Sequence, residues 1–94
     1  MNAMLWNVRG TGARSFPTLI KYLTNFHKLD FIALFETRCG GDKAVRIASR
    51  LGFNNMHLVD AEGYKGGIWC LWSDKLRKVE IIETSNQYVH IRIN

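Results

Sequence analysis

The stretch that decides the fold class is DFIALF at residues 30–35, which is followed by ETR at residues 36–38. A nearly continuous apolar run of this length is typical of a strand covered on both faces, as in a parallel or mixed sheet. An earlier apolar run, AMLWNV at residues 3–8, leads into RGTG at residues 9–12 and predicts a first strand followed by a turn. Two buried strands are therefore expected near the amino terminus.

The segment between these two strands has helical spacing. Ser15 stands where a capping side chain is expected, and Pro17 falls in the first turn, where proline is tolerated. The apolar residues recur at intervals of three or four: Phe16, Leu19, Ile20, Leu23, and Phe26 or His27. The first part of the chain therefore predicts a strand-helix-strand unit, whose two strands are parallel.

The second half predicts one more helix and then short strands. Residues 40–42 (GGD) provide a loop and a cap, residues 43–51 carry a helical apolar stripe, and Gly52 suits a left-handed helix end. Four strands with hairpin-like spacings follow, at residues 55–59, 67–72, 77–83 and 88–93. The fold class is α/β, with a βαβ start followed by antiparallel strands. Because no element follows the last strand to cover it, residues 1–94 are expected to be a partial, incomplete domain.

Composition narrows the class of protein. The chain is 47% hydrophobic and has a net charge of +5, from 13 Lys and Arg against 8 Asp and Glu, which suits a globular protein with an anionic partner such as nucleic acid. Cys39 and Cys70 lie far apart without a nearby Cys or His, so neither a disulfide nor a zinc site is expected. No secretory leader and no membrane span is predicted. An intracellular location, nucleus or cytoplasm, is the expectation.

Two side chains form a candidate site. Asn7 lies near the end of the first predicted strand and Glu36 directly follows the second. The carboxyl ends of parallel strands meet at one edge of a sheet, where α/β proteins bind ligands. A carboxylate after so apolar a run would be satisfied by a hard cation, with an amide oxygen beside it. The alternative interpretation is that Glu36 is an ordinary solvated loop residue and Asn7 a turn former.

Three short motifs occur in order along the chain: WNVRG at residues 6–10, FETR at residues 35–38, and GYKGGIW at residues 63–69. Together they resemble the opening motifs of the endonuclease/exonuclease/phosphatase family, above all its apurinic-endonuclease-like branch. With LGF at 51–53, LW at 71–72 and NQY at 86–88, the whole chain resembles the start of the endonuclease domain of plant LINE-type (non-LTR) retrotransposon polyproteins.

This resemblance implies a fold and a set of roles. The chain would form the N-terminal portion of the family's α/β sandwich. Asn7 would help to organise the metal and phosphate site, and Glu36 would coordinate Mg²⁺ or Mn²⁺. Tyr64 and Lys65 would lie on a substrate-facing loop, although the family more often has a Ser where this chain has Lys65. DNA is the partner that the resemblance implies.

Other parts of the family's machinery are absent from the sequence. Neither its Asp-x-Asn motif nor its Ser-Asp-His motif occurs in these residues. The three histidines, His27, His57 and His90, lack the required neighbouring Asp and are expected to be structural. The expected function is thus an N-terminal fragment of a metal-dependent phosphodiesterase or DNA endonuclease, inactive alone, and whether the chain is itself an enzyme is left open.

Two alternatives to this function stay open. The chain could be a small basic module that binds nucleic acid without catalysis, or a non-functional gene fragment. A third pattern, Gly10-x-Gly12 between a strand and a helix, is typical of dinucleotide-binding loops, but its third glycine is replaced by Ser15.

Overall fold

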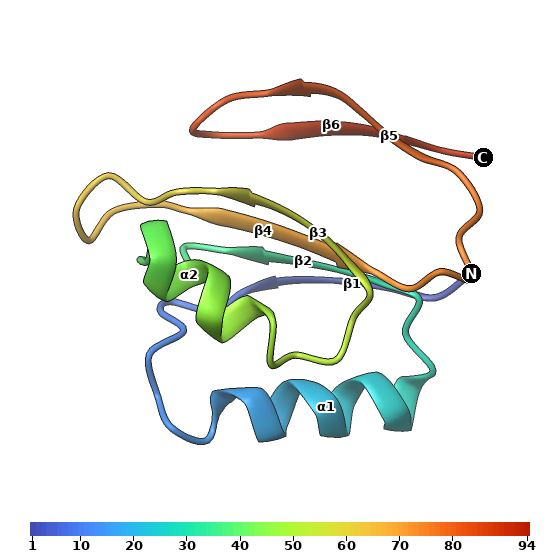
Figure 1. The fold of residues 1–94 in the computed structure, drawn as a ribbon, viewed down its shortest axis with the longest axis horizontal. Coiled ribbons are helices and arrows are strands. Elements are labelled where there is room, and N and C mark those ends of the chain that lie inside the picture. Colours follow the sequence, from blue (N-terminus) through green and yellow to red (C-terminus); the bar gives the residue numbers. More distant parts are fainter.

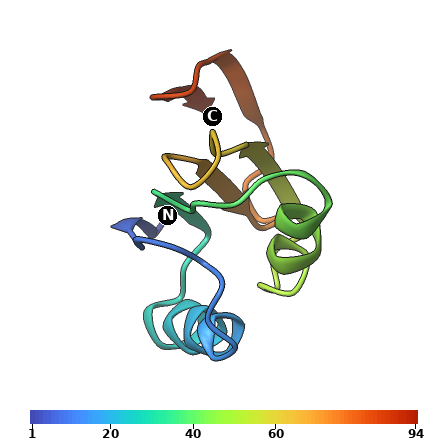
Figure 2. The ribbon, with the colours of Figure 1, turned by 90° about the vertical axis from the view of Figure 1, so that its left-hand side faces the viewer.

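Two helices, a four-stranded sheet and a two-stranded hairpin form three successive layers in the computed structural model, which describes residues 1–94 (Figure 1). The hairpin lies on the opposite side of the sheet from the helices (Figure 2). In chain order the elements are β1 (Ala3–Asn7), α1 (Phe16–His27), β2 (Phe31–Phe35), α2 (Gly41–Ala48), β3 (Asn55–Val59), β4 (Ile68–Trp72), β5 (Val79–Thr84) and β6 (Val89–Ile93).

The four-stranded sheet has the strand order β1-β2-β4-β3. β1 and β2 are parallel, while β4 runs antiparallel to both of its neighbours, β2 and β3. The predicted strand-helix-strand unit is therefore confirmed, and the fold is a mixed α/β sheet. β2 and β4 are central strands with layers on both faces, which explains why each is apolar along its whole length and buried at its first four positions.

The main core lies between the sheet and the helices. Helix α1 contributes the buried Phe16 and Ile20, and α2 contributes Ala44 and Ala48. The sheet contributes the side chains that point the same way: Ile32, Leu34, Trp69 and Leu71. Because α2 presents alanines, it can approach the sheet closely, and the bulk of the core comes from the strands. We call this region the helix-side core.

A smaller core lies between the sheet and the hairpin, and we call it the hairpin-side core. Its buried members come from β2 and β4: Phe31, Ala33, Ile68 and Cys70. Half-buried side chains of β6 cover them from above: Val89, Ile91 and Ile93. A groove of about 460 Å³ remains open on this side, lined by ten hydrophobic residues out of eleven. Leu5 of the edge strand β1 lies on its rim and is 71% exposed.

The helix ends differ in detail from those predicted. Ser15 occupies the cap position of α1, but its side chain makes no capping hydrogen bond, because its backbone is already helical (φ −79°, ψ −8°). Helix α2 covers Gly41–Ala48 rather than residues 43–51, and Gly40 occupies its cap position while Asp42 lies in the first turn. Gly52 has a positive φ of 92°, as expected, but after a short turn rather than directly after the helix.

The expected hairpin between β4 and β5 is wrong. Both edges of β4 are already paired, with β2 and with β3, so β5 cannot pair with β4. The chain instead crosses at residues 73–78 to the second layer, where β5 and β6 pair antiparallel with a bulge between Ile81 and Glu83. In β6 the predicted alternation is confirmed: Val89, Ile91 and Ile93 are half-buried, while the residues between them are exposed.

The structure also bears on membrane spans and on the two cysteines. No helix of the structure is both long and apolar enough to cross a membrane. Cys39 and Cys70 are free thiols, and both are buried. Burial raises the pKa of Cys70 to about 11.

Candidate functional site

The structure places Asn7 and Glu36 at the same edge of the sheet. Asn7, the last residue of β1, is the register partner of Phe35, and Glu36 directly follows Phe35. Beyond the strands the pairing continues, since the Val8 N–H donates to the Phe35 carbonyl at 3.0 Å and the Gly10 N–H to that of Glu36 at 2.8 Å. Asn7 is exposed and Glu36 half-buried, so both can meet a ligand from solvent.

Glu36 is not an ordinary first loop residue, because its backbone is left-handed (φ 52°). Four residues other than glycine have a positive φ: Arg9 (53°), Glu36, Arg38 (55°) and Lys28 (56°). Lys28 caps the end of α1, where this conformation is routine. The other three stand together at the carboxyl edge of β1 and β2. Each costs about 1–2 kcal/mol relative to a right-handed residue, and such strain concentrates at functional sites.

Backbone hydrogen bonds hold this strained segment in place. The Thr37 N–H donates to the Gly67 carbonyl at 3.2 Å and the Arg38 N–H to that of Gly66 at 2.8 Å. The Thr11 hydroxyl donates to the Thr37 carbonyl at 3.1 Å. Three loops, after β1, after β2 and before β4, are thereby tied to one another around Thr37. Figure 2 looks onto the end of the molecule where these loops lie side by side.

The close approach of Thr37 requires a glycine at position 67. Its φ is +94°, and a Cβ atom there would lie 2.1 Å from the Thr37 hydroxyl oxygen. Thr37 has no exposed surface, and its hydroxyl has no hydrogen-bond partner. Gly66 is also left-handed (φ 73°) but meets nothing within 4 Å, so only Gly67 combines a left-handed backbone with a close contact.

The charged side chains at this edge are accessible. The Glu36 Oε1 lies 4.0 Å from the Arg38 Nη2, and the two side chains are 42% and 46% exposed. An exposed pair at this distance contributes little to stability. Arg38 also crosses the first loop, with its Cδ 3.9 Å from where a Cβ of Gly10 would lie. The edge thus presents a carboxylate beside a guanidinium.

The donor set agrees with a hard divalent cation only in part. Nowhere in the structure do three or more His, Cys, Asp or Glu side chains gather closely enough to form a metal-binding cluster. Glu36 and Asn7 supply one carboxylate and one amide oxygen. Mg²⁺ keeps several water molecules and is commonly bound through one or two carboxylates together with a substrate phosphate, so two protein ligands are compatible with it.

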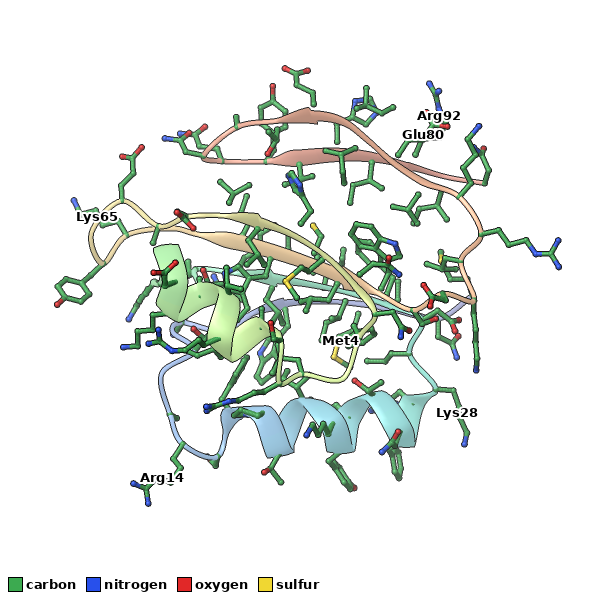
Figure 3. All side chains as sticks on the ribbon, in the orientation of Figure 1. Met4, Arg14, Lys28, Lys65, Glu80 and Arg92 are labelled. Atoms are coloured by element: carbon green, nitrogen blue, oxygen red, sulfur yellow. The ribbon has the colours of Figure 1, made fainter.

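Tyr64 and Lys65 lie at the same end of the molecule but on the tip of the turn between β3 and β4. Glu62 and Lys65 exchange two backbone hydrogen bonds, of 2.9 and 3.1 Å, which makes a tight turn around Gly63 and Tyr64. Tyr64 is 89% exposed, and Lys65 projects from the tip of the turn (Figure 3). Neither forms an ion pair or a side-chain hydrogen bond with Glu36. Their proposed contact with substrate stays a prediction.

A small polar hollow of about 130 Å³ lies beneath this turn. It contains no hydrophobic residue and is lined by Asp60, Glu62, Lys65, Gly66, Gly67 and Asn86. The Asn86 side-chain amide donates to the Glu62 carboxylate at 3.2 Å, so the tip of the β5–β6 hairpin is joined to the turn. The hollow borders the loop that holds Thr37.

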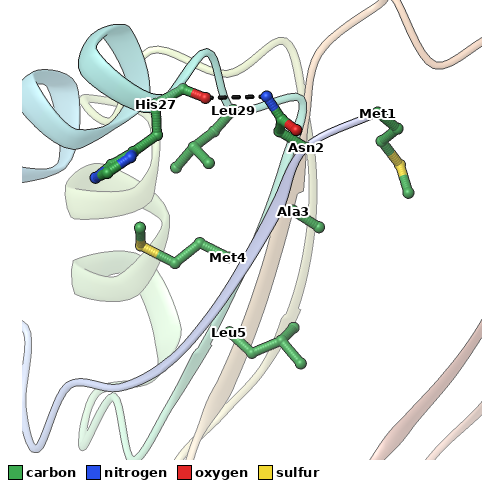
Figure 4. A pocket seen from close by; sticks show the side chains of 7 residues that line it. All are labelled: Met1, Asn2, Ala3, Met4, Leu5, His27 and Leu29. Atoms are coloured by element: carbon green, nitrogen blue, oxygen red, sulfur yellow. Dashed lines mark hydrogen bonds between the residues drawn. The ribbon is translucent and has the colours of Figure 1, made fainter.

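The largest hollow lies at the other end of β1 and carries no candidate chemistry. It measures about 700 Å³ and is lined mostly by apolar side chains between β1 and the end of α1 (Figure 4). Asn2 and His27 are its polar members, and the Asn2 amide donates to the His27 carbonyl at 3.1 Å. It contains neither a carboxylate nor a Lys or Arg, so we assign no ligand to it.

The histidines are distributed away from Glu36. His27 ends α1, with its ring against Phe26 at 5.0 Å between centroids. His57 on β3 shares a 3.3 Å hydrogen bond with the Thr84 hydroxyl of β5 and so connects the two sheets. His90 is an exposed position of β6. The structure brings none of them into hydrogen-bonding contact with the candidate site.

Sequence reasoning missed three residues of this edge: Arg9, Thr37 and Arg38. All three fall within the motifs at residues 6–10 and 35–38 but were given no role there, and no sequence signal indicates that a non-glycine residue is left-handed. The Gly66-Gly67 pair was the available hint that a backbone or side chain approaches closely there.

No known protein-family profile matches the sequence, and comparison with curated proteins gives no match.

Proposed function

We propose that the chain forms the N-terminal part of a divalent-metal-dependent phosphodiesterase domain of the endonuclease/exonuclease/phosphatase type, derived from a LINE-type retrotransposon. The observation that carries this proposal is the strained carboxyl edge of β1 and β2, where Asn7 stands beside a left-handed Glu36. The motifs at residues 6–10, 35–38 and 63–69 all map to this end of the molecule. DNA is the proposed substrate, in keeping with the net charge of +5.

In this proposal the chain's own residues bind and orient. Glu36 offers a carboxylate from a backbone position that the hydrogen bonds of its neighbours hold in place. Asn7 offers an amide oxygen or N–H from the adjacent strand. A bound Mg²⁺ or Mn²⁺ would neutralise a phosphodiester oxygen and stabilise the leaving oxyanion.

Hydrolysis by these residues alone is not part of the proposal. Activation of a water molecule requires a base within hydrogen-bonding reach. None of the three histidines forms a hydrogen bond at this edge, and Arg38 is the one ion-pair partner of Glu36. We expect purified protein to show no Mg²⁺-dependent nicking of plasmid DNA. Nicking that Glu36→Ala abolishes would refute the inactivity and support the family.

The cation site itself is tested by Mn²⁺ titration followed by NMR. Mn²⁺ should broaden the resonances of Asn7, Glu36 and their neighbours first, and Glu36→Gln should remove this effect. Glu80→Gln is the matched control, because Glu80 is a carboxylate at the far end of the hairpin (Figure 3). Broadening that is unchanged in Glu36→Gln, or that centres on Glu80, would refute the cation site.

A basic binding module without catalysis is the alternative function, and the distribution of charge does not favour it. Arg14, Lys28, Lys65 and Arg92 project from separate ends of the molecule (Figure 3). DNA binding that is insensitive both to chelator and to Glu36→Gln would support it instead.

A further inference from the structure

We propose that β1 pairs with the β1 strand of a second copy of this chain, in an antiparallel arrangement centred on Leu5, and that the chain thereby forms a symmetric dimer. β1 is an edge strand, because it stands at one end of the four-stranded sheet and has β2 as its partner on one side only. The inference is independent of the proposed function. It rests on the backbone of β1, on the hollows beside this strand and on the absence of charge along it.

The free edge of β1 presents a regular row of unpaired backbone groups. The residues that flank the strand, Asn2 and Val8, both form backbone hydrogen bonds with β2 or the residue before it. Because the N–H and C=O groups of successive residues in a strand face opposite sides, the even-numbered residues of β1 face β2 and the odd-numbered ones face away from it. The N–H and C=O groups of Ala3, Leu5 and Asn7 therefore point toward the free edge.

This row of groups is complementary to a second copy of itself. When Leu5 lies opposite Leu5 of the second copy, antiparallel pairing sets Ala3 opposite Asn7, and all three residues fall at hydrogen-bonded positions. Each of them then donates one N–H and offers one carbonyl to the other strand. A two-fold arrangement of this kind uses the same surface on both copies, so it closes as a dimer and does not grow further.

Hollows flank the free edge on both faces of the sheet. The hollow of about 700 Å³ lies on the helix side and the groove of about 460 Å³ on the hairpin side, and Ala3 and Leu5 line both of them. Figure 4 shows Met4 on one side of β1, with Ala3 and Leu5 on the other. An added strand directs alternate side chains to the two faces, as in recognition of extended peptides by sheet edges. In the proposed register Trp6 of the second copy, opposite Met4, enters the helix-side hollow.

Leu5 gains the most from this pairing. Its side chain is 71% exposed on the rim of the hairpin-side groove. Residues that lie directly opposite each other in an antiparallel pair point to the same face, so the Leu5 side chains of the two copies would contact each other there. Burial of two exposed leucines supplies an apolar contribution at the centre of the interface.

The distribution of charge favours a second copy of β1 as the partner strand. No charged side chain and no proline occurs from Met1 to Val8, although charges and prolines are the usual protection of an edge strand. In a two-fold pair each residue lies close to its own counterpart, so a charged edge would repel itself, and this edge does not. The strands of the hairpin differ, because β5 and β6 carry Glu80, Glu83 and Arg92. The other edge strand, β3, lines none of the hollows.

Sedimentation equilibrium over a range of protein concentrations measures the association. A single pair of strands buries an area at the small end of protein interfaces, so monomer and dimer should both be populated. The average mass of the wild-type protein should rise with concentration toward twice the monomer mass. Leu5→Lys should weaken dimerisation at least about tenfold, because it places two like charges opposite each other.

Leu19→Lys is the matched control, since it makes the same change at an exposed leucine of α1. It should alter dimerisation less than about twofold. Leu19, Tyr22 and Phe26 form the exposed apolar stripe of α1, which is the alternative surface for self-association. Dimerisation that Leu19→Lys weakens and Leu5→Lys does not would refute the pairing of β1.

A proline at the first position of β1 tests the backbone pairing separately. Ala3→Pro removes an N–H that faces the free edge and makes no bond to β2, so the monomer should keep its fold and its circular dichroism spectrum. Dimerisation should weaken about tenfold, through the lost hydrogen bonds. Ala3→Thr keeps the N–H and should dimerise like the wild type. Equal dimerisation of the two variants would refute pairing through the backbone.

The register is tested by NMR on a mixture of isotope-labelled and unlabelled protein. Residues at non-hydrogen-bonded positions of an antiparallel pair approach most closely, so an intermolecular contact is expected between the α protons of Met4 and of Trp6 in the second copy. The amide protons of Leu5 and Asn7 should exchange more slowly as the concentration rises. A protein that stays monomeric at every concentration, one that grows beyond a dimer, or a dimer without these contacts would each overturn the proposal.

Discussion

The two faces of the four-stranded sheet differ in how completely they are covered. On one face, α1 and α2 close the helix-side core, in which Ile20, Leu34 and Trp69 have no exposed surface. On the other face, a two-stranded hairpin leaves a groove of about 460 Å³ open beside the edge strand β1. Because the helix side buries its side chains more completely, we expect it to contribute more to the stability of the molecule than the hairpin side. The candidate site lies at the end of the sheet that both layers share.

The largest effect should come from the centre of the helix-side core. Trp69→Ala should lower the free energy of unfolding by about 3–5 kcal/mol, because it empties the largest fully buried side chain of the molecule. Urea denaturation measures this loss. Trp69→Phe should cost much less, since the buried Nε1 of Trp69 has no hydrogen-bond partner to lose. Equal losses in the two variants would contradict this account of the core.

A second effect tests the shared end of the sheet. Gly67→Ala should cost on the order of 2–3 kcal/mol, because the new Cβ would meet the Thr37 hydroxyl and an alanine would be forced into a left-handed conformation. Gly66→Ala is the matched control, with a positive φ but open space, and should cost only about 1–2 kcal/mol. Adding Thr37→Ala to Gly67→Ala should remove the steric part of this cost, because the hydroxyl that the new Cβ meets is gone. The cost of the left-handed alanine should remain. Equal costs at Gly66 and Gly67 would show that the close contact is absent.

The hairpin-side core can be probed through the pH dependence of stability. Burial raises the pKa of Cys70 to about 11, from 9.0 for a free thiol. The folded state therefore keeps a proton that the unfolded state loses, so stability is intact below pH 9 and decreases as the pH rises toward 11. The loss should reach about 2 kcal/mol at pH 11. Urea midpoints at pH 8 and pH 10.5 measure it.

Variants of the two cysteines identify the source of this pH dependence. Cys70→Ala should abolish it, and Cys39→Ala should leave it in place. A Cys70 that titrates as a free thiol would mean that the hairpin opens far enough to admit water to its core, which would sharpen the contrast between the two faces.

The smallest effects are expected on the hairpin side of the sheet, in β6 and on the rim of the groove. Ile91→Ala should cost about 1 kcal/mol, well below the value for a fully buried isoleucine, because Ile91 is only half-buried above the groove. Leu5→Thr, on the exposed rim, should change stability by less than about 0.5 kcal/mol. A loss at Ile91 as large as that at Trp69 would refute the contrast between the faces.

Much of this fold is predictable from local pattern. The run at residues 31–35 is apolar throughout because β2 is covered on both faces and paired on both edges, and helix α1 carries a clear stripe. The β4–β5 connection was mispredicted because local spacing contains no information on which strand edges are already taken. Pairing is decided by contacts distant in sequence.

The candidate site was predictable only in outline. The position of Asn7 and Glu36 at one edge follows from parallel pairing, which the strand-helix-strand pattern indicates. The left-handed Arg9, Glu36 and Arg38 do not follow from any local preference, since arginine and glutamate disfavour that conformation. Hydrogen bonds from loops that lie far apart in sequence impose it.

The connection between the hairpin and the turn that precedes β4 has a consequence for motion. Two side-chain hydrogen bonds join the hairpin to the rest of the molecule: His57 to Thr84, and Asn86 to Glu62. A two-stranded hairpin is marginally stable by itself, so the β5–β6 layer is expected to open locally, with its amide protons exchanging ahead of those in β2 and β4. Each opening releases Glu62 and loosens the turn that leads into Gly66 and Gly67. The amide protons of this turn should therefore exchange at a rate similar to those of the hairpin. The rigidity of the strained edge would then depend partly on the β5–β6 hairpin.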